Sequence, residues 1–114
     1  MGLPVQDRNS MDMRNQILDS INLVEYQEGS VVSRTLLDKK TGTITLFAFT
    51  EGEGLSEHTA PFDAFVYIID GKANIYIDGK EHIVEKGKFI IMPKDLPHLL
   101  RAIEKFKMML VMIR

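Results

Sequence analysis

Histidine is the residue type in this chain that is best suited to chemistry. The sequence holds His58, His82 and His98 and no cysteine, which excludes disulfides, thiolate ligands and cysteine nucleophiles. An imidazole changes its charge near neutral pH and also coordinates metals, so a pair of them suits proton transfer or metal binding. No phosphate-binding loop and no paired carboxylates accompany the histidines in the sequence. Their chemistry therefore depends on the elements that position them.

The composition is that of one soluble domain. A length of 114 residues suffices for one hydrophobic core but not for two, and the apolar share of 45% is ordinary. Fourteen basic residues oppose 16 acidic ones without a marked basic cluster, so we expect neither nucleic acid nor a membrane as a partner. The longest apolar stretch, residues 108–113, is too short to span a bilayer, and no secretory signal is visible. A cytoplasmic location is expected.

The sequence pattern changes at about residue 22. Residues 1–22 are predicted to form a polar tail and a short helix at residues 11–20, with Ser10 as its N-cap. Residues 23–114 alternate short apolar runs with turn signals, which is typical of an antiparallel β-barrel. We predict nine strands, at residues 23–26, 31–38, 43–50, 64–70, 73–78, 81–84, 89–92, 98–102 and 106–113.

Two Asp-Gly pairs, Asp70–Gly71 and Asp78–Gly79, stand between predicted strands. Glycine accepts the positive φ that a tight hairpin turn requires, and Asp-Gly is a strong hairpin signal. Both pairs are therefore predicted to be hairpin turns in a meander of short strands.

The last predicted strand is apolar on both faces. Alternation places the even-numbered residues from Phe106 to Met112 toward the barrel interior, while Met109, Val111 and Ile113 form a second apolar face. A strand that is apolar on both faces is normally buried on both sides, but one barrel has one interior. We expect a homodimer interface on the outer face, with a helix laid across the strand as the alternative.

Two segments carry the spacing of a known family. The first reads Gly52, five residues, His58, one residue, Ala60, three residues, Ala64, six residues, Gly71. The second reads Gly87, five residues, Pro93, one residue, Asp95, two residues, His98, three residues, Ala102. In order and spacing these segments resemble the two signature segments of the cupins, over about half of the chain. The resemblance implies an all-β fold, a single cupin barrel (double-stranded β-helix or jelly roll), with the short helix in front of it.

The chain departs from the cupin pattern at four positions. Cupins usually carry glycine at the position of Asp95 and asparagine at that of Ala102. Aspartate tolerates positive φ better than most residues, so Asp95 is an acceptable replacement. The other two departures, Ala60 and Ala64, replace a histidine and a glutamate that hold the family's metal.

The resemblance implies a metal cage of three histidines and one glutamate, of which only His58 and His98 remain here. Two imidazoles bind a divalent ion weakly, so no metal is expected as a cofactor. If Zn, Ni, Fe or Mn is bound, its ligands are His58 and His98, with Asp63 as a further candidate if a bulge turns it inward. We consider Asp63 better suited to capping backbone amides at the Pro61–Phe62 turn, and Glu57 a poorer ligand still.

We therefore expect a binding protein whose barrel cavity holds a small organic ligand. Its walls are predicted to comprise Ala60, Ala64, Val66 and Met108, with His58 and His98 as the polar end that meets a carboxylate or hydroxyl group. Separate packing roles for the two histidines are the alternative. A second hypothesis is a cupin enzyme, either a metal-dependent dioxygenase or an isomerase or lyase that uses the reduced two-histidine site. A purely assembling role is the third, and His82 is expected to face solvent.

Overall fold

Residues 13–114 are described by the computed structural model, and their regular secondary structure is almost entirely β. Apart from one 3₁₀ turn, η2 (Ser20–Asn22), they form eight strands. These are β1 (Val31–Lys39), β2 (Gly42–Phe49), β3 (Gly54–His58), β4 (Asp63–Ile77), β5 (Lys80–Glu85), β6 (Phe89–Met92), β7 (His98–Arg101) and β8 (Phe106–Ile113). The predicted all-β class is confirmed. No helix in this part of the chain has the length and apolarity needed to cross a membrane.

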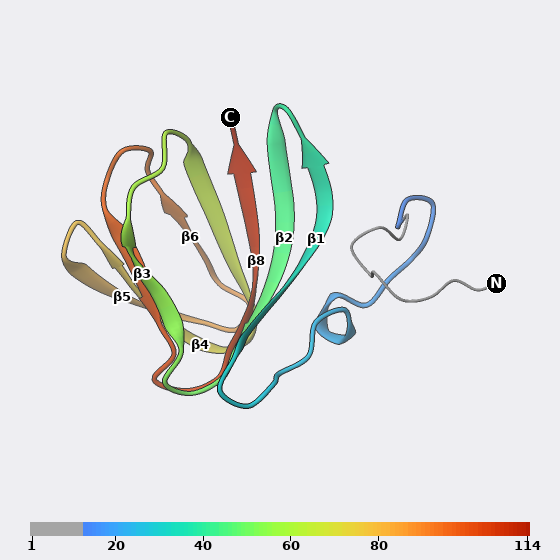
Figure 1. The fold of residues 1–114 in the computed structure, drawn as a ribbon, viewed down its shortest axis with the longest axis horizontal. Coiled ribbons are helices and arrows are strands. Elements are labelled where there is room, and N and C mark those ends of the chain that lie inside the picture. The colour runs from blue at the N-terminus through green and yellow to red at the C-terminus, as the bar shows by residue number, and fades with distance from the viewer. Residues whose placement is uncertain (1–12) are drawn as a thin grey trace.

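Strand β4 belongs to both sheets of the molecule. Its first half pairs with β8 and β6, and its second half pairs with β7 and β5. Sheet A therefore has the order β1-β2-β8-β4-β6, and sheet B has the order β3-β7-β4-β5. Figure 1 shows the two sheets diverging from β4, which is the arrangement of a curled jelly roll.

The passage of β4 from one sheet to the other occurs at Asp70–Gly71. The pairing of β4 with β8 shifts register between Ile68 and Asp70, and Gly71 has a φ of 74°. The predicted hairpin at this position is wrong, because the pair lies inside one continuous strand of 15 residues, directly after a bulge at which β4 has one residue more than β8. The hairpin at Asp78–Gly79 is confirmed, with φ values of 51° and 80° and Ile77 paired with Lys80.

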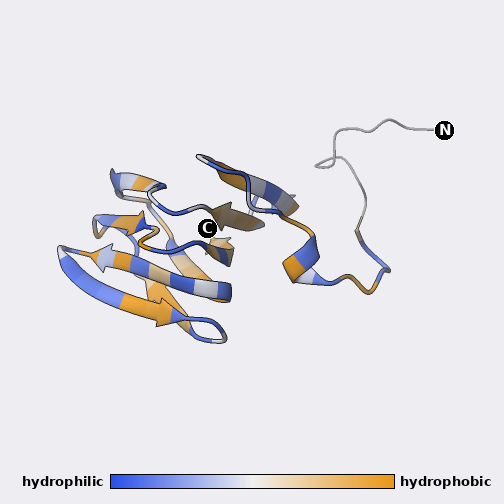
Figure 2. Cartoon of the chain, turned by 90° about the horizontal axis from the view of Figure 1, so that it is seen from below, coloured by the Kyte–Doolittle hydropathy of each residue, from blue (hydrophilic) through white to orange (hydrophobic). Residues whose placement is uncertain are grey.

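The main core lies between the two sheets. Phe49 and Phe106 stack there with ring centroids 4.5 Å apart, and both side chains are completely buried. Met108, Leu110 and Met112 pack into the same cluster, so the predicted inward face of β8 is confirmed. Figure 2 shows hydrophobic and hydrophilic residues following one another along the strands, which is the alternation that produces two different faces.

The predicted N-terminal helix is wrong over the residues that the structure describes. Residues 13–19 form a turn and extended backbone, and Asn15 has a φ of 65°, which interrupts a right-handed helix. Ile17 is fully exposed, so the apolar spacing that suggested a helix has no surface to pack on. The predicted positions 11 and 12 and the predicted N-cap Ser10 lie outside the described residues.

The segment after η2 is not the strand predicted at residues 23–26 but a strap across the outer face of sheet A. Its Val24 forms a second buried cluster with Leu46 and Ala48 of β2. Two buried cations hold the strap by hydrogen bonds to its carbonyls: Lys107 Nζ donates to the oxygen of Ile21 at 2.6 Å, and Arg34 Nη1 donates to the oxygen of Leu23 at 3.1 Å. The helix considered as the alternative cover of β8 is therefore wrong, and an irregular segment covers part of this face instead.

Replacing Tyr26 with phenylalanine is expected to lower the free energy of unfolding by about 1 kcal/mol, because the Tyr26 hydroxyl donates to Asp70 Oδ2 at 2.7 Å and ties the strap to β4. Burial and this hydrogen bond raise the pKa of Tyr26, so the phenol keeps its proton. Urea unfolding measures the loss. The control is Tyr76→Phe, whose hydroxyl donates to Glu81 on an exposed surface and should matter less. Equal losses in both variants would contradict this account of the strap.

Candidate functional site

The site begins with the pairing of β3 and β7 at one edge of sheet B. The two strands are antiparallel, and His58, the last residue of β3, pairs with His98, the first residue of β7. The register of the ladder shifts between Leu55 and His58, where β3 has one residue more than β7. Because directly paired residues of neighbouring strands project to the same face, two histidines that are 40 positions apart in sequence meet.

The two imidazole rings are in contact. Their Nε2 atoms lie 3.1 Å apart, and their ring centroids are separated by 4.4 Å with the planes at 72°. The Nδ1 atom of His58 lies 2.7 Å from the carbonyl oxygen of Ser56, and that of His98 lies 3.2 Å from the carbonyl oxygen of Leu96. A carbonyl oxygen can only accept a hydrogen bond, so each Nδ1 carries the proton.

This tautomer has a consequence for the facing nitrogens. With Nδ1 protonated on both neutral rings, both Nε2 atoms present a lone pair, and two lone pairs at 3.1 Å repel each other. The contact becomes favourable when a cation is shared by the pair, either one proton or a metal ion.

The two rings differ in their exposure to water. His98 is 4% exposed, whereas His58 is exposed at the end of its strand. Burial lowers the pKa of His98, and the neighbouring charge on His58 lowers it further, against a smaller opposite effect of the hydrogen bond to Leu96. The two rings of the pair are therefore unequal, with one in contact with water and the other buried.

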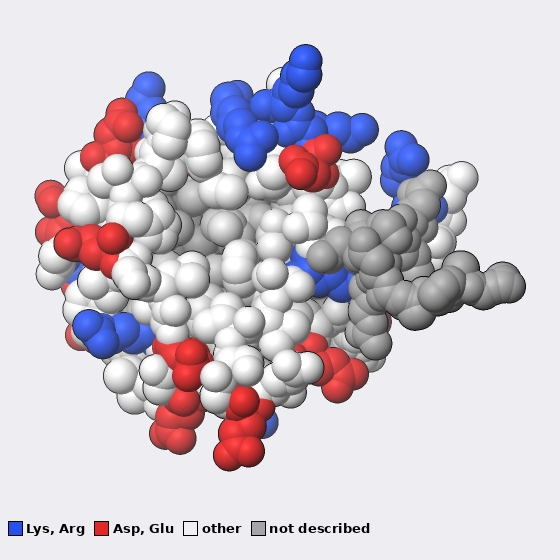
Figure 3. Space-filling view, viewed as in Figure 1, with Lys and Arg blue, Asp and Glu red and all other residues white. Residues whose placement is uncertain are grey.

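The predicted wall residues occupy different depths. Ala64, Val66 and Met108 lie in the main core between the sheets and are at most 2% exposed. Ala60 follows β3 and is half-buried; its carbonyl oxygen accepts a hydrogen bond of 2.8 Å from the amide of Asp95. Asp95 has a φ of 66°, which confirms the left-handed conformation predicted for it. Figure 3, which has the same view as Figure 1, shows a hollow near the centre of the molecule with uncharged side chains around it.

Asp63 has a structural partner. Its Oδ1 accepts a hydrogen bond of 2.9 Å from the backbone amide of Lys94. The carboxylate therefore caps an amide of the turn after Pro93, rather than an amide of the Pro61–Phe62 turn as predicted. Glu57 is exposed and lines a groove that contains neither His58 nor His98.

The two histidines supply only part of a metal site. Two nitrogen ligands at about 2.0–2.1 Å from one ion lie roughly 2.9–3.4 Å apart for bond angles between a right angle and a tetrahedral one, and the observed separation of 3.1 Å falls in this range. Each Nδ1 is also hydrogen-bonded to a carbonyl, as in histidines that ligate metals. Within residues 13–114, however, no three histidine or acidic side chains lie together in a way that could hold an ion. The donor set does not fit a tightly retained metal.

His82 was predicted to face solvent, and this is wrong. On β5 it pairs with Ile75, whose side chain is fully buried in the core, so His82 lies on the inner face of sheet B together with Val84. Its Nδ1 atom is buried and has no hydrogen-bond partner among the described residues. The alternation His82–Ile83–Val84 would have indicated this face, because Val84 is an apolar residue two positions on.

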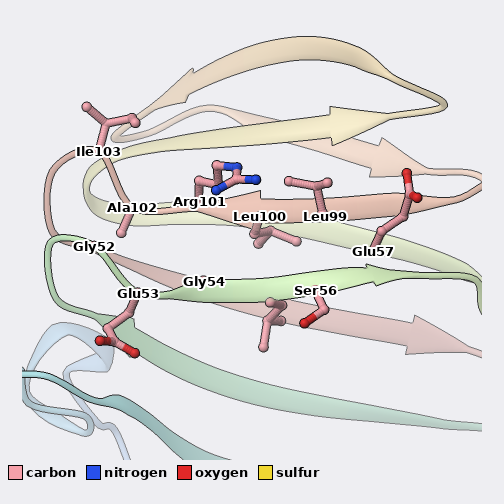
Figure 4. A pocket seen from close by; sticks show the side chains of 11 residues that line it. Gly52, Glu53, Gly54, Ser56, Glu57, Leu99, Leu100, Arg101, Ala102 and Ile103 are labelled. Atoms are coloured by element: carbon pink, nitrogen blue, oxygen red, sulfur yellow. The ribbon is translucent and has the colours of Figure 1, made fainter.

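A surface groove of about 520 Å³ runs along β3 and β7, and neither His58 nor His98 lines it. Figure 4 shows Glu57, Leu99 and Arg101 on one side of these strands and Ser56 on the other. A second groove, of about 590 Å³, lies between the N-terminal residues and the outer face of sheet A. Neither groove contains the residues predicted for a barrel site.

Fold and site together define a small jelly-roll barrel with an imidazole pair where two neighbouring strands meet. Residues 45–114, which are more than half of the chain, match the cupin domain family, and the chain belongs to this family.

Known structures and sequences resemble the chain over most of its length. A conserved protein of unknown function, SPY1581 from Streptococcus pyogenes, is 36% identical, with 88% of each chain covered and a TM-score of 0.84. A cupin 2 conserved barrel domain protein from Leptotrichia buccalis is 42% identical over 82% of this chain and 46% of its own, with a TM-score of 0.81. Polyketide synthase CurC from Streptomyces cyaneus is 27% identical over 97 residues, and the chain spans 63% of its length.

Proposed function

We propose that this cupin domain binds a small organic ligand between its two sheets, with His58 and His98 as the polar end of the site. The observation that carries the proposal is the Nε2–Nε2 contact of 3.1 Å with both Nδ1 atoms anchored to carbonyls. The carbonyls hold both rings in one orientation, and the Nε2 atoms remain able to form hydrogen bonds with a ligand. The rest of the predicted wall is apolar, which favours a ligand with a hydrocarbon body.

The polar group of the ligand is a carboxylate or a hydroxyl. When one proton is shared by the pair, the resulting positive charge attracts a carboxylate oxygen, and a hydroxyl can donate to a ring nitrogen that carries a lone pair. His82, with its buried and unpartnered Nδ1 on the same inner face of sheet B, supplies a second contact in this proposal. The similarity to a protein named as a polyketide synthase supports organic-molecule chemistry.

The binding proposal is tested by thermal shift with a panel of small carboxylic acids and alcohols. A ligand that binds only the folded state raises the melting temperature, and the stabilisation grows with the logarithm of its concentration over Kd. For any compound that responds, we expect the apparent Kd derived from the thermal shifts to rise at least tenfold in His58→Ala and in His98→Ala. Arg101→Ala, which changes an exposed residue of β7 in the separate groove, is the control. A panel without any response, or unchanged shifts in both histidine variants, would refute the proposal.

The alternative is an enzyme that uses the same two-histidine site. The observation in its favour is that an exposed and a buried imidazole in contact form a path for a proton between solvent and the interior. Metal content separates a metal-dependent dioxygenase from the binding proposal. We expect elemental analysis of untagged protein, purified without chelator, to find far less than one transition-metal ion per chain, because two imidazoles alone compete poorly for an ion. A near-stoichiometric metal would favour the enzyme.

A further inference from the structure

Thr43 carries a buried hydroxyl group that forms no hydrogen bond. Its Oγ1 atom is shielded from water and has no partner among residues 13–114. A polar atom in this state costs free energy, so those that native proteins retain usually meet a bound molecule or have another role. Two further atoms of the described chain share this state, Arg34 Nε and His82 Nδ1. Arg34 holds the strap and His82 belongs to the proposed site, which leaves the hydroxyl of Thr43 to be explained.

Thr43 lies on the inner face of sheet A, in one row with a residue of the predicted wall. It pairs with Met112 of β8, and Met112 pairs in turn with Ala64 of β4. Met112 and Ala64 both pack into the main core between the sheets, so the side chain of Thr43 is directed to the same face. Neighbouring strands of a sheet are about 4.8 Å apart, so two such spacings, about 10 Å, separate Thr43 from Ala64.

The row of Thr43 lies at the end of the molecule that holds the histidine pair. Strand β4 begins at Asp63, soon after His58, and Asp63 pairs with Ile113 at the end of β8. Figure 1 shows that β2 starts at this same end. The predicted site therefore has polar atoms on both sheets, with the Nε2 atoms on sheet B and the hydroxyl of Thr43 on sheet A.

We propose that Thr43 is a second polar anchor of the ligand site, and that the ligand carries a polar group at each end of an apolar body. This inference rests on the proposed function, since it needs a ligand that is held at His58 and His98. The hydroxyl can donate a hydrogen bond to a carboxylate or carbonyl oxygen and can accept one from a hydroxyl. Dicarboxylic, hydroxy and keto acids therefore form the ligand class. An acid with one polar end leaves the hydroxyl of Thr43 unpaired and lacks this contribution.

Met112 is the side chain that opens the way to Thr43 in this proposal. Because the Oγ1 atom of Thr43 is shielded from water, a ligand reaches it by displacing a neighbouring side chain. Met112 pairs with Thr43 and is only half-buried. Methionine is unbranched and has three rotatable bonds, so it can move aside without a change in the backbone.

The first test replaces the hydroxyl with a methyl group of similar size, in Thr43→Val. Because the hydroxyl is buried without a partner, we expect this variant to melt at a higher temperature than the wild type when no ligand is added. The matched control is Thr45→Val on the same strand and face, whose hydroxyl is not among the buried unpartnered atoms; its gain should be smaller. A lower melting temperature of Thr43→Val would overturn the proposal, because the hydroxyl would then have a structural partner.

The second test compares straight-chain acids of equal length, with and without a second polar group at the far end. From thermal shifts, we expect the wild type to bind the bifunctional acids at least about fivefold more tightly, and Thr43→Val to lose this preference while Thr45→Val keeps it. His58→Ala should weaken the binding of both kinds of acid.

The outcomes of the second test separate the assignment of Thr43 from the proposed function. Equal affinity of the wild type for both kinds of acid would overturn the assignment, and so would a preference that persists in Thr43→Val. In either case, weaker binding in His58→Ala would still support the proposed function. No response to any acid would refute the proposed function, and the assignment of Thr43 with it.

Discussion

Replacing Gly71 with alanine is expected to destabilise the domain by about 2–5 kcal/mol or to prevent folding. The left-handed conformation at φ 74° costs a residue with a Cβ atom roughly 1–2 kcal/mol. In addition, a Cβ at this position would overlap the carbonyl oxygen of Lys105 and lie 2.9 Å from the Cα of Phe106. Both are backbone atoms that cannot move aside without opening the pairing of β4 with β8, and such overpacking costs about 1–3 kcal/mol more.

A control for Gly71→Ala isolates the cost of overlap from that of conformation. Gly79 has a φ of 80°, but a Cβ built there meets nothing within 4 Å. Gly79→Ala should therefore lose only the conformational part, about 1–2 kcal/mol. Urea unfolding followed by circular dichroism measures both variants. Similar losses in the two would show that the close approach of β4 and β8 at Gly71 is not a determinant of stability.

Restoring the two missing side chains, in the double variant Ala60→His and Ala64→Glu, is expected to create a stoichiometric metal site. Ala60 stands two residues after His58, and Ala64 lies on the inner face of β4, where it is 2% exposed. With these changes the number of protein ligands rises from two to four. Four-ligand zinc sites in small domains bind with about 10–16 kcal/mol at neutral pH, which also offsets the burial of the new carboxylate.

Metal gain is measured by elemental analysis of the purified double variant and by calorimetric titration with Zn²⁺. Ala60→His combined with Ala64→Gln is the matched control, because glutamine keeps the size of glutamate but lacks its charge; it should bind more weakly. Adding His98→Ala to the double variant should remove most of the gain. If the double variant binds no more zinc than wild type, Ala60 and Ala64 do not face the histidine pair.

Local pattern was sufficient for most of the fold. The period of two in β8 placed Phe106 and Met108 inside, and Asp78–Gly79 forms the predicted hairpin because its φ requirement is local. Strand β3 was missed because Gly54–His58 has one large apolar residue, Leu55, and is held by pairing with β7 rather than by its own burial. The same limit explains Asp70–Gly71, since a glycine with positive φ fits a hairpin turn as well as a bend inside a strand next to a bulge. Which of the two structures forms depends on the strands that pair with this segment, and those strands are remote in sequence.

The helix predicted from the apolar spacing at residues 11–20 is absent from the described part of this segment for a related reason. Helical periodicity stabilises a short helix only when its apolar side packs on something, and the exposed Ile17 has no such surface. The outer face of β8, in contrast, was predicted to need a cover, and the cluster around Val24 of the strap covers part of it at Met109.

For the histidine pair, sequence and structure contribute different parts. The motif spacing by itself singled out His58 and His98 and showed that Ala60 and Ala64 stand where further ligands are usual, because spacing along a chain is a local property. Only the tertiary structure decided that the Nε2 atoms face each other at 3.1 Å and that His82 lies on the inner face. Those relations depend on strand pairing between distant segments and on backbone carbonyls that orient each ring, and residue identity does not encode either.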